Sequence, residues 1–381
     1  MDIQGYCAPG FEALYDAFAI NFSDHGDVGA SFCAVHQQEI VASLWAGSAD
    51  RGGERPFEED TLVNVFSSSK GILALIALQQ VAAGNLDLDL PVAHYWPEFA
   101  AAGKQSITGR QLLCHRSGVI AFRDRVADEL IYDWQGALTQ VAGTAPWWEP
   151  GTQQGYSPFL YGWTLGGLIE KASGQSLMSL YRAGIADPLA LAGGFGAVGH
   201  RSAEIADVGA LKKPLPELRD NAIGRSIKQD RQGPVATAFT NPVSLMTGTN
   251  SEQWRSALIP AANGHFCARD LATVYGDLAS EDPQLLPRDL LHSATAEQSR
   301  GQDAILQADV AFGCGFIKSA AARDLQFGGP AGFGHPGAGG SVGFADPEAE
   351  LGFGYVTSRM GQSLFMDQRA IGMMECLYRL L

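Results

Sequence analysis

Ser67 and Lys70 are the residues of this 381-residue chain whose types and spacing most clearly allow chemistry, because a lysine amine can take the proton of a serine hydroxyl. The apolar segment 71–83 follows them and predicts a buried helix that ends at Gly84-Asn85. Side chains three residues apart share one face of a helix, and burial lowers a lysine pKa, as a base requires. Free N-H groups of the first turn would stabilise an oxyanion. The pair predicts a serine nucleophile with a lysine base; the alternative is a helix-capping serine beside a surface lysine.

A tyrosine on a tight loop is the second candidate. The segment 147–151 leads to Tyr156, and an apolar helix is expected from Tyr161 onwards. A phenol that points into a cleft beside a charged lysine is expected to have a lowered pKa, so that it serves as a base for the serine. The alternative is a tyrosine that only packs in the core.

Glycines crowd the segment 334–340, which is expected to lead into a strand. Backbone without side chains can approach a ligand closely, so this segment is a candidate for the second oxyanion donor. The alternative is a glycine-rich turn into an edge strand. His335, within the segment, could act as the base of a catalytic triad; we expect instead a substrate-side role near the acyl pocket.

Two motif matches in the same region are misleading. Residues 339–343 match the Gly-x-Ser-x-Gly nucleophile elbow with Ser341 as nucleophile, but that motif needs a helix directly after it, and 344–347 has the pattern of a strand end and a turn. Residues 332–337 match the dinucleotide fingerprint, yet Pro336 lies inside the match and no helix follows. We expect neither Ser341 as the nucleophile nor any cofactor.

The elements that must position these residues follow a simple order. Short strands are expected near both ends of the chain, and helical periodicity dominates between them. We predict an α/β (α+β) domain built from residues 1–66 and 261–381, with a mainly helical domain inserted at 67–260. Residues 200–250 have few periodic apolar positions, which favours an irregular, lid-like segment. The expected strands cover 28–36, 39–44, 310–317, 340–345 and 351–357, and a closing helix covers 364–380.

Composition narrows the possible partners. A formal net charge of -15 and a pI near 4.9 argue against nucleic acid, acidic membrane surfaces and polyanionic substrates. No lysine or arginine precedes Arg51, and no apolar run is long enough to span a membrane, so a soluble, cytoplasmic protein is expected. The 6 cysteines are scattered without Cys-x-x-Cys spacing, so we expect reduced thiols and no metal.

These stretches, in this order, resemble the serine β-lactamase-like superfamily, and in particular the class C β-lactamase-like carboxylesterases called family VIII esterases. The resemblance extends along nearly the whole chain. It implies a β-lactamase/transpeptidase-like fold, with a mostly antiparallel sheet flanked by terminal helices, an all-helical second domain and an active site between them. The further segments that carry it are 86–89, 91–92, 95–99, 112–118, 148–151, 260–265 and 334–347.

The resemblance also implies roles for individual residues. Ser67 would be the nucleophile that forms an acyl-enzyme, with Lys70 and Tyr156 as the pair that moves protons. The backbone N-H groups of Ser67 and Ala338 would form the oxyanion hole. The expected substrate-binding residues are His335, Gly337, Trp148 and Phe159.

Two departures from the superfamily pattern favour esters over β-lactam antibiotics. Where β-lactamases carry Lys-Thr-Gly, whose cation binds the carboxylate of the drug, this chain has His335-Pro336-Gly337. Where they usually carry Tyr-x-Asn, it has Tyr156-Ser157-Pro158, which lacks the amide side chain. We therefore expect a carboxylesterase for short-chain, neutral, small-molecule esters, with weak β-lactam cleavage at most. The alternatives are an acyltransferase or D-amino-acid peptidase on the same scaffold, and a non-catalytic binding protein.

Overall fold

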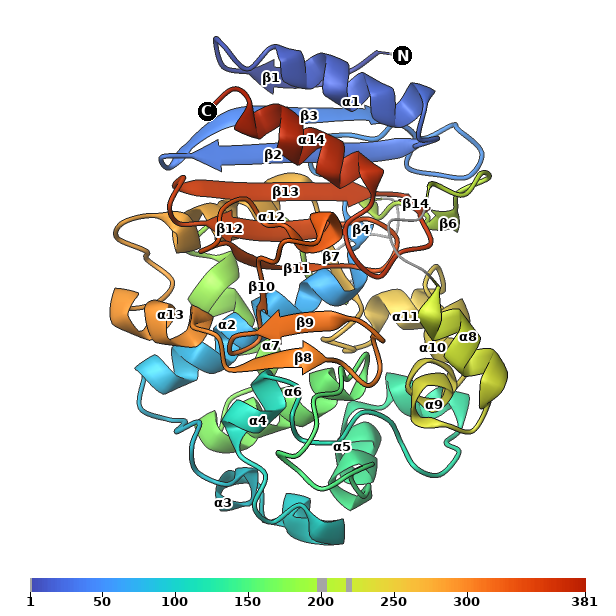
Figure 1. Cartoon of the computed structure of the whole chain (residues 1–381), viewed down its shortest axis with the longest axis vertical. Helices are drawn as coiled ribbons and strands as arrows, with labels where there is room; N and C mark the ends of the chain where they lie inside the picture. The colour runs from blue at the N-terminus through green and yellow to red at the C-terminus, as the bar shows by residue number, and fades with distance from the viewer. Residues whose placement is uncertain (1, 197–203, 217–220) are drawn as a thin grey trace.

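A nine-stranded antiparallel sheet forms the centre of the computed structural model, which describes residues 2–196, 204–216 and 221–381 (Figure 1). Three of its strands come from the beginning of the chain and six from its last third. In the order in which they pair, the strands are β1 (Gln4–Cys7), β3 (Glu39–Gly47), β2 (Gly29–His36), β13 (Leu351–Thr357), β12 (Val342–Asp346), β11 (Phe333–Pro336), β10 (Ile317–Lys318), β9 (Asp309–Phe312) and β8 (Ser299–Gln302).

The two ends of the chain meet inside this sheet. β13 pairs with β2 along its whole length, beginning with Leu351 opposite His36. β2 and β3 form the predicted hairpin, and its turn residues Gln37 and Gln38 have positive φ angles of 51° and 66°. The strand predicted at 310–317 is two short strands instead, because the glycine-containing turn after Phe312 interrupts β9 and β10.

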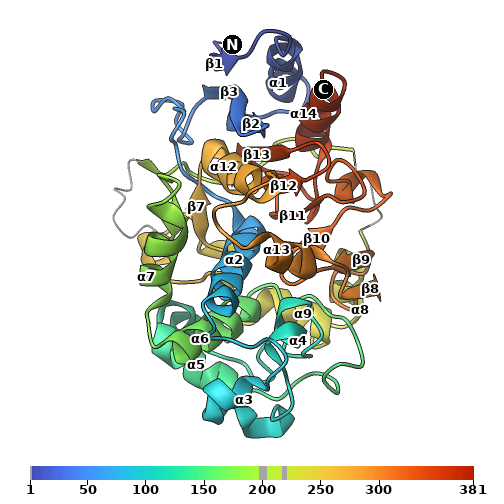
Figure 2. The same ribbon diagram turned by 90° about the vertical axis from the view of Figure 1, so that its left-hand side faces the viewer.

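Helices cover both faces of the sheet. α1 (Ala13–Ser23) and α14 (Gln368–Tyr378) pack together on one face, and α12 (Ala268–Ala279) lies on the other (Figure 2). α12 lies very close to the strands: a Cβ atom added to Gly354 would be 2.1 Å from the carbonyl oxygen of Ala268. Glycines in β13 therefore permit this packing, which no larger side chain would allow.

A helical region occupies the other half of the molecule. α2 (Ser69–Ala82) is buried along almost its whole length and packs on both α6 (Leu160–Ser173) and β11, so it lies between the helical region and the sheet. The predicted domain boundaries, which place an inserted helical domain at residues 67–260, stay a prediction. The other helices here are η1 (Phe66–Ser68), α3 (Val92–Tyr95), η2 (Pro97–Gly103), α4 (Gly109–Leu113), η3 (Asp128–Tyr132), α5 (Trp134–Gly143), α7 (Leu177–Tyr181) and η4 (Arg182–Ala186).

The segment 200–250 is more regular than the sequence predicts, although 200–203 and 217–220 lie outside the described residues. Three short helices form in it, and polar or proline starts explain the first two: the Asn221 side chain accepts from the Gly224 N-H, and Pro234 stands at the first position of the next helix. Each is too short for its periodicity to stand out. The helices are α8 (Ala222–Gln229), α9 (Pro234–Thr240) and α10 (Ser244–Thr247).

Small elements complete the chain. A second sheet places β4, which precedes η1, beside the strand that follows α11. All six cysteines are free, and five of them are buried. Among the described helices, none combines the length and apolar character needed to cross a bilayer. The remaining elements are β4 (Val63–Asn64), β5 (Gly194–Phe195), β6 (Gly209–Ala210), α11 (Glu252–Ser256), β7 (Gly264–Phe266), α13 (Arg288–Thr295), η6 (Arg323–Leu325) and β14 (Arg359–Met360).

Candidate active site

Ser67 lies in a tight turn between β4 and α2. Phe66, the residue before it, has a φ angle of 47°, in the left-handed region that few non-glycine residues adopt, so the surrounding structure must hold the turn. The Ser69 hydroxyl contributes to this, since it donates to the Phe66 carbonyl at 2.5 Å and accepts from the Gly264 N-H at 3.0 Å. Contacts within the protein therefore fix the backbone of the turn that carries Ser67.

Lys70 is fully buried, and its side-chain nitrogen has three partners. Nζ lies 3.2 Å from Oγ of Ser67, 2.7 Å from the carbonyl oxygen of Pro158 and 2.9 Å from that of Ala261. Burial lowers the pKa of Lys70 well below its ordinary value. The predicted contact with Ser67 is present, and the predicted direction of the lysine pKa is confirmed.

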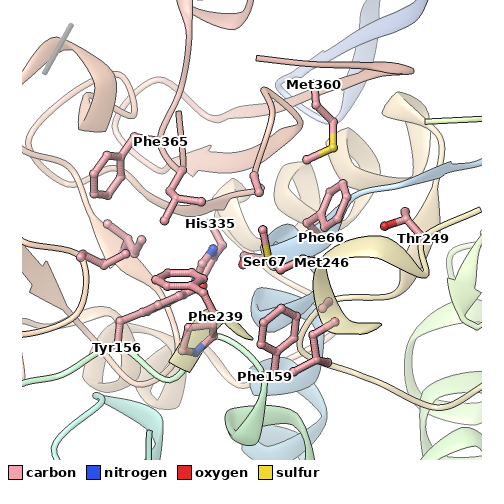
Figure 3. A pocket seen from close by; sticks show the side chains of 17 residues that line it. Phe66, Ser67, Tyr156, Phe159, Phe239, Met246, Thr249, His335, Met360 and Phe365 are labelled. Carbon is pink, nitrogen blue, oxygen red and sulfur yellow. The ribbon is translucent and has the colours of Figure 1, made fainter. Parts of the chain in front are cut away.

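Tyr156 reaches the same point from the loop before α6. Its side chain is buried, its ring centroid lies 4.8 Å from Nζ of Lys70, and its hydroxyl shares a hydrogen bond with Ser67. Figure 3 shows Ser67, Tyr156 and His335 around one space. The structure therefore brings together the three residues that the sequence singled out as a catalytic group.

The protonation of Tyr156 differs from the expectation. Burial raises the pKa of Tyr156 above its ordinary value, the hydrogen bond with Ser67 opposes this, and the charge of Asp303 adds to the rise. The predicted lowering is wrong, because burial of the phenol is the largest influence on its pKa, and burial also disfavours the charged lysine that was expected to stabilise a phenolate. Tyr156 is a neutral phenol at neutral pH.

His335 points into the same space from β11. Its Nδ1 lies 2.8 Å from the carbonyl oxygen of Pro336, so Nδ1 carries the proton and Nε2 is an acceptor. Burial, with Lys70 as a second cause, lowers the pKa of His335 to about 3. The ring is thus neutral and supplies no cation for a carboxylate. Its position agrees with the substrate-side role expected for it, which stays a prediction.

The turn between β11 and β12 passes directly over the turn that carries Ser67. A Cβ atom on Gly337 would lie 2.1 Å from the carbonyl oxygen of Val65, so only glycine permits this approach. Gly337 does not line the pocket, whereas Ala338 lines it together with Ser67. The Ala338 and Ser67 N-H groups as oxyanion donors, and Gly337 as a substrate contact, stay predictions.

Ser341 lies at the end of the same turn and is buried. Strand β12 begins at the next residue, so the helix that a nucleophile elbow requires does not follow. The glycine-rich match at 332–337 likewise includes β11 and is followed by no helix. Neither match therefore has the helix that its motif requires.

An apolar pocket opens beside Ser67 and holds about 730 Å³ of space, counted to its open mouth. Among the residues that the structure describes, its lining contains no Asp, Glu, Lys or Arg side chain. Phe159, one of the expected substrate-binding residues, lies in its wall. No cluster of three or more metal-binding side chains occurs in the described ranges. The large side chains that shape the pocket are Phe66, Phe159, Phe239, Met246, Met360 and Phe365 (Figure 3).

Trp148 does not belong to the pocket lining. Its Nε1 donates to the carbonyl oxygen of Gln153 at 3.2 Å, and its ring occupies the space that a side chain on Gly155 would need, 2.4 Å from that Cβ position. Trp148 as a substrate contact stays a prediction, which the lining of this pocket does not support. The indole packs instead on the loop that carries Tyr156.

Two walls of the pocket were missed by the sequence analysis. Phe239 and Met246 come from α9 and α10, and Met360 and Phe365 come from β14 and the chain after it. None of them belongs to a motif, and only tertiary folding brings them to Ser67. The one available signal was the presence of apolar residues in the otherwise polar segment 200–250.

Comparison with known proteins identifies the family. The Beta-lactamase family model matches residues 15–373, so the chain belongs to the Beta-lactamase family. The esterase/β-lactamase LipL of Mycobacterium tuberculosis is 28% identical over 377 residues, which cover 97% of this chain and 86% of LipL.

Solved structures agree with this assignment. A family VIII carboxylesterase is similar with a TM-score of 0.87 and 34% identity, and a penicillin-binding protein homologue from Caulobacter crescentus with 0.89 and 33%. Each comparison covers 100% of both chains. The fold is β-lactamase/transpeptidase-like, as predicted, and the family together with its esterase relatives indicates a serine hydrolase.

Proposed function

We propose that the protein is a carboxylesterase that hydrolyses neutral, short-chain esters through an acyl-enzyme on Ser67. The observation that carries the proposal is the set of three partners around Nζ of Lys70. A neutral amine has two N-H donors and one lone pair. The carbonyl groups of Pro158 and Ala261 can only accept, so they take the two N-H groups and direct the lone pair at the hydroxyl of Ser67.

This arrangement supports Lys70 as the base for acylation. Lys70 takes the proton of Ser67 while Oγ forms a bond to the ester carbonyl carbon, and the carbonyl electron pair moves to the oxyanion. The bond to the alcohol oxygen then breaks. The leaving alkoxide receives the proton, which passes from Lys70 through the neutral phenol of Tyr156.

Release of the acid uses the same groups in reverse. A water molecule attacks the acyl carbon and gives its proton to Lys70 through the Tyr156 hydroxyl, and Ser67 recovers a proton when its bond to carbon breaks. A neutral phenol suits this relay because it can donate and accept in one step. The raised pKa of Tyr156 therefore favours a relay over a phenolate base.

The pocket supports neutral esters as the substrate class. Its walls are apolar, its described lining residues include no charged side chain, and His335 is neutral. A β-lactam carboxylate would lose its hydration there without gaining a cation, which makes its binding unfavourable. The ammonium group of a D-amino-acid substrate would likewise lack a carboxylate partner. LipL carries both esterase and β-lactamase in its name, so weak β-lactam cleavage belongs in the test.

A panel of p-nitrophenyl esters and one chromogenic cephalosporin tests this proposal on the wild type, Ser67→Ala and Ser341→Ala. We expect the wild type and Ser341→Ala to hydrolyse the short esters far faster than the cephalosporin, and Ser67→Ala to hydrolyse neither. Ester hydrolysis at the wild-type rate by Ser67→Ala would refute the proposal. Product analysis with an added alcohol separates hydrolysis from acyl transfer.

A further inference from the structure

Asp303 is a buried carboxylate that lies next to the site but does not line the pocket. It lies directly after β8, in the turn that leads to β9, and its side chain is fully buried. Its Oδ1 and Oδ2 atoms accept from the backbone N-H of Tyr156, at 3.0 and 2.9 Å. The residue that relays the proton is therefore anchored, through its backbone, to a side chain from a distant hairpin.

The same carboxylate also holds its own turn. Oδ1 accepts from the N-H groups of Ile305 and Leu306, both at 2.9 Å, and Leu306 is part of the pocket wall. One side chain thus joins the loop of the relay residue to the wall of the acyl pocket. A second link runs in parallel, because the Ala304 N-H donates to the Gln154 carbonyl at 3.0 Å.

The bonding of Asp303 is unlike that of an ordinary buried acid. Among the ion pairs of the described residues none includes Asp303, so backbone N-H groups and the side chain of Gln154 satisfy its charge. Burial raises its pKa, and the bonds from Leu306, Tyr156 and Ile305 oppose that rise. A buried charge without a cation costs stability, and such a cost is commonly retained where it positions functional groups.

We propose that Asp303 is a positioning residue that fixes the Tyr156 loop so that the phenol stays within reach of Ser67. The inference rests on the proposed function, since it assigns Tyr156 the proton relay. Its effect should appear in the chemical step, because a small displacement of a proton-relay group lowers the rate more than it lowers binding. Asp303 does not line the pocket, so it touches no substrate.

Asp303→Asn is the direct test, because an amide keeps the shape but offers one acceptor oxygen in place of two. We expect kcat for p-nitrophenyl butyrate to fall about 10- to 100-fold with KM changed less than about threefold. Wild-type kcat in a folded Asp303→Asn protein would overturn the proposal. Gln154→Leu, which removes a 3.1 Å bond to the Val310 carbonyl from the same loop, should lower kcat in the same direction.

Asp270→Asn is the matched control. Asp270 is also buried, and it too accepts backbone N-H groups, from Ala192 at 3.0 Å and Gly193 at 2.9 Å, but it lies outside the pocket. We expect it to lower the melting temperature comparably while kcat stays within about twofold of the wild type. Equal loss of kcat in both variants would show a merely structural role and overturn the proposal.

A double-mutant cycle with Tyr156→Phe gives the decisive readout. If Asp303 acts through the Tyr156 hydroxyl, Asp303→Asn should cost little further activity in the Tyr156→Phe background. If the two residues act independently, the fold-losses in kcat of the single variants should multiply in the double variant. Multiplying effects would overturn the proposal even if each variant is impaired. Failure of the esterase function itself is recognised separately, because the wild type would then show no Ser67-dependent ester hydrolysis at all.

Discussion

At the scale of single residues, the surroundings of Lys70 decide what the site can do. A lysine is a base only when it is neutral, and full burial disfavours its charge. Its spacing from Ser67 was predictable from sequence because an i, i+3 pair on a helix is a local feature. The carbonyl groups of Pro158 and Ala261 were not predictable, because only the tertiary fold brings them to Nζ.

The first prediction concerns Lys70 itself. Lys70→Met keeps the apolar stem and removes the nitrogen, so kcat/KM for short esters should fall about 10²- to 10⁴-fold. Lys104→Met is the matched control: Lys104 is also buried, and its Nζ also has three partners, which are the carbonyl groups of Ala101, Ala142 and Thr144. The Lys104→Met protein should lose stability, while its kcat stays within about twofold of the wild-type value. Equal inactivation of the two proteins would argue against a base role for Lys70.

The second prediction concerns pH. Catalysis needs neutral Lys70, so kcat/KM should rise with pH through the lysine pKa of the free enzyme, which lies well below its ordinary value, and then level off. His335, with its pKa near 3, is neutral over this range, so replacing it should leave the acidic limb of the pH profile unchanged. The pH profiles of the wild type and His335→Gln check this expectation. Loss of the acidic limb in His335→Gln would assign it to the histidine.

At the scale of elements, strand and helix identity was largely predictable, and packing partners were not. The hairpin of β2 and β3 and the helix α6 have strong local patterns, and both were predicted. α9 and α10 escaped prediction because four to seven residues are too few to show a helical period. Their place over the pocket depends on contacts with distant parts of the chain, which local patterns do not contain.

The third prediction tests α9 as a wall of the acyl pocket. Phe239→Ala removes a ring from the lining, so the ratio of kcat/KM for p-nitrophenyl octanoate to that for the butyrate should rise about 10-fold. Phe22→Ala on α1, which removes a ring outside the pocket lining, should leave the ratio unchanged. An unchanged ratio in Phe239→Ala would place the acyl chain elsewhere.

At the scale of the whole molecule, a buried ionic network joins both ends of the chain to the turn over Ser67. Arg369 of α14 contacts Asp27 at 3.0 Å and Asp367 at 2.6 Å, and it donates to the Gly339 carbonyl at 2.6 Å. Gly339 directly follows Ala338, the predicted oxyanion donor. The fold class was predictable from motif order, but this network was not, because its residues belong to no motif.

The fourth prediction concerns this network. Arg369→Leu leaves two buried carboxylates without their cation, so the free energy of unfolding should fall by about 3–5 kcal/mol. Arg323→Leu breaks the exposed ion pair, 2.7 Å long, between Arg323 and Glu375 of α14. This change should lower the free energy of unfolding by less than about 1 kcal/mol. Chemical denaturation of both variants measures the difference. Similar losses in the two proteins would show that the buried network adds nothing to stability.

The most direct test of the account is to map the serine that a fluorophosphonate probe labels, by digestion and mass spectrometry. If Ser67 is the nucleophile, we expect one phosphonyl group on Ser67 in the wild type and in Ser341→Ala, and none in Ser67→Ala. The apolar pocket and the base of Lys70 both favour this reaction. Labelling of another residue, or an active enzyme that the probe does not label at Ser67, would contradict it.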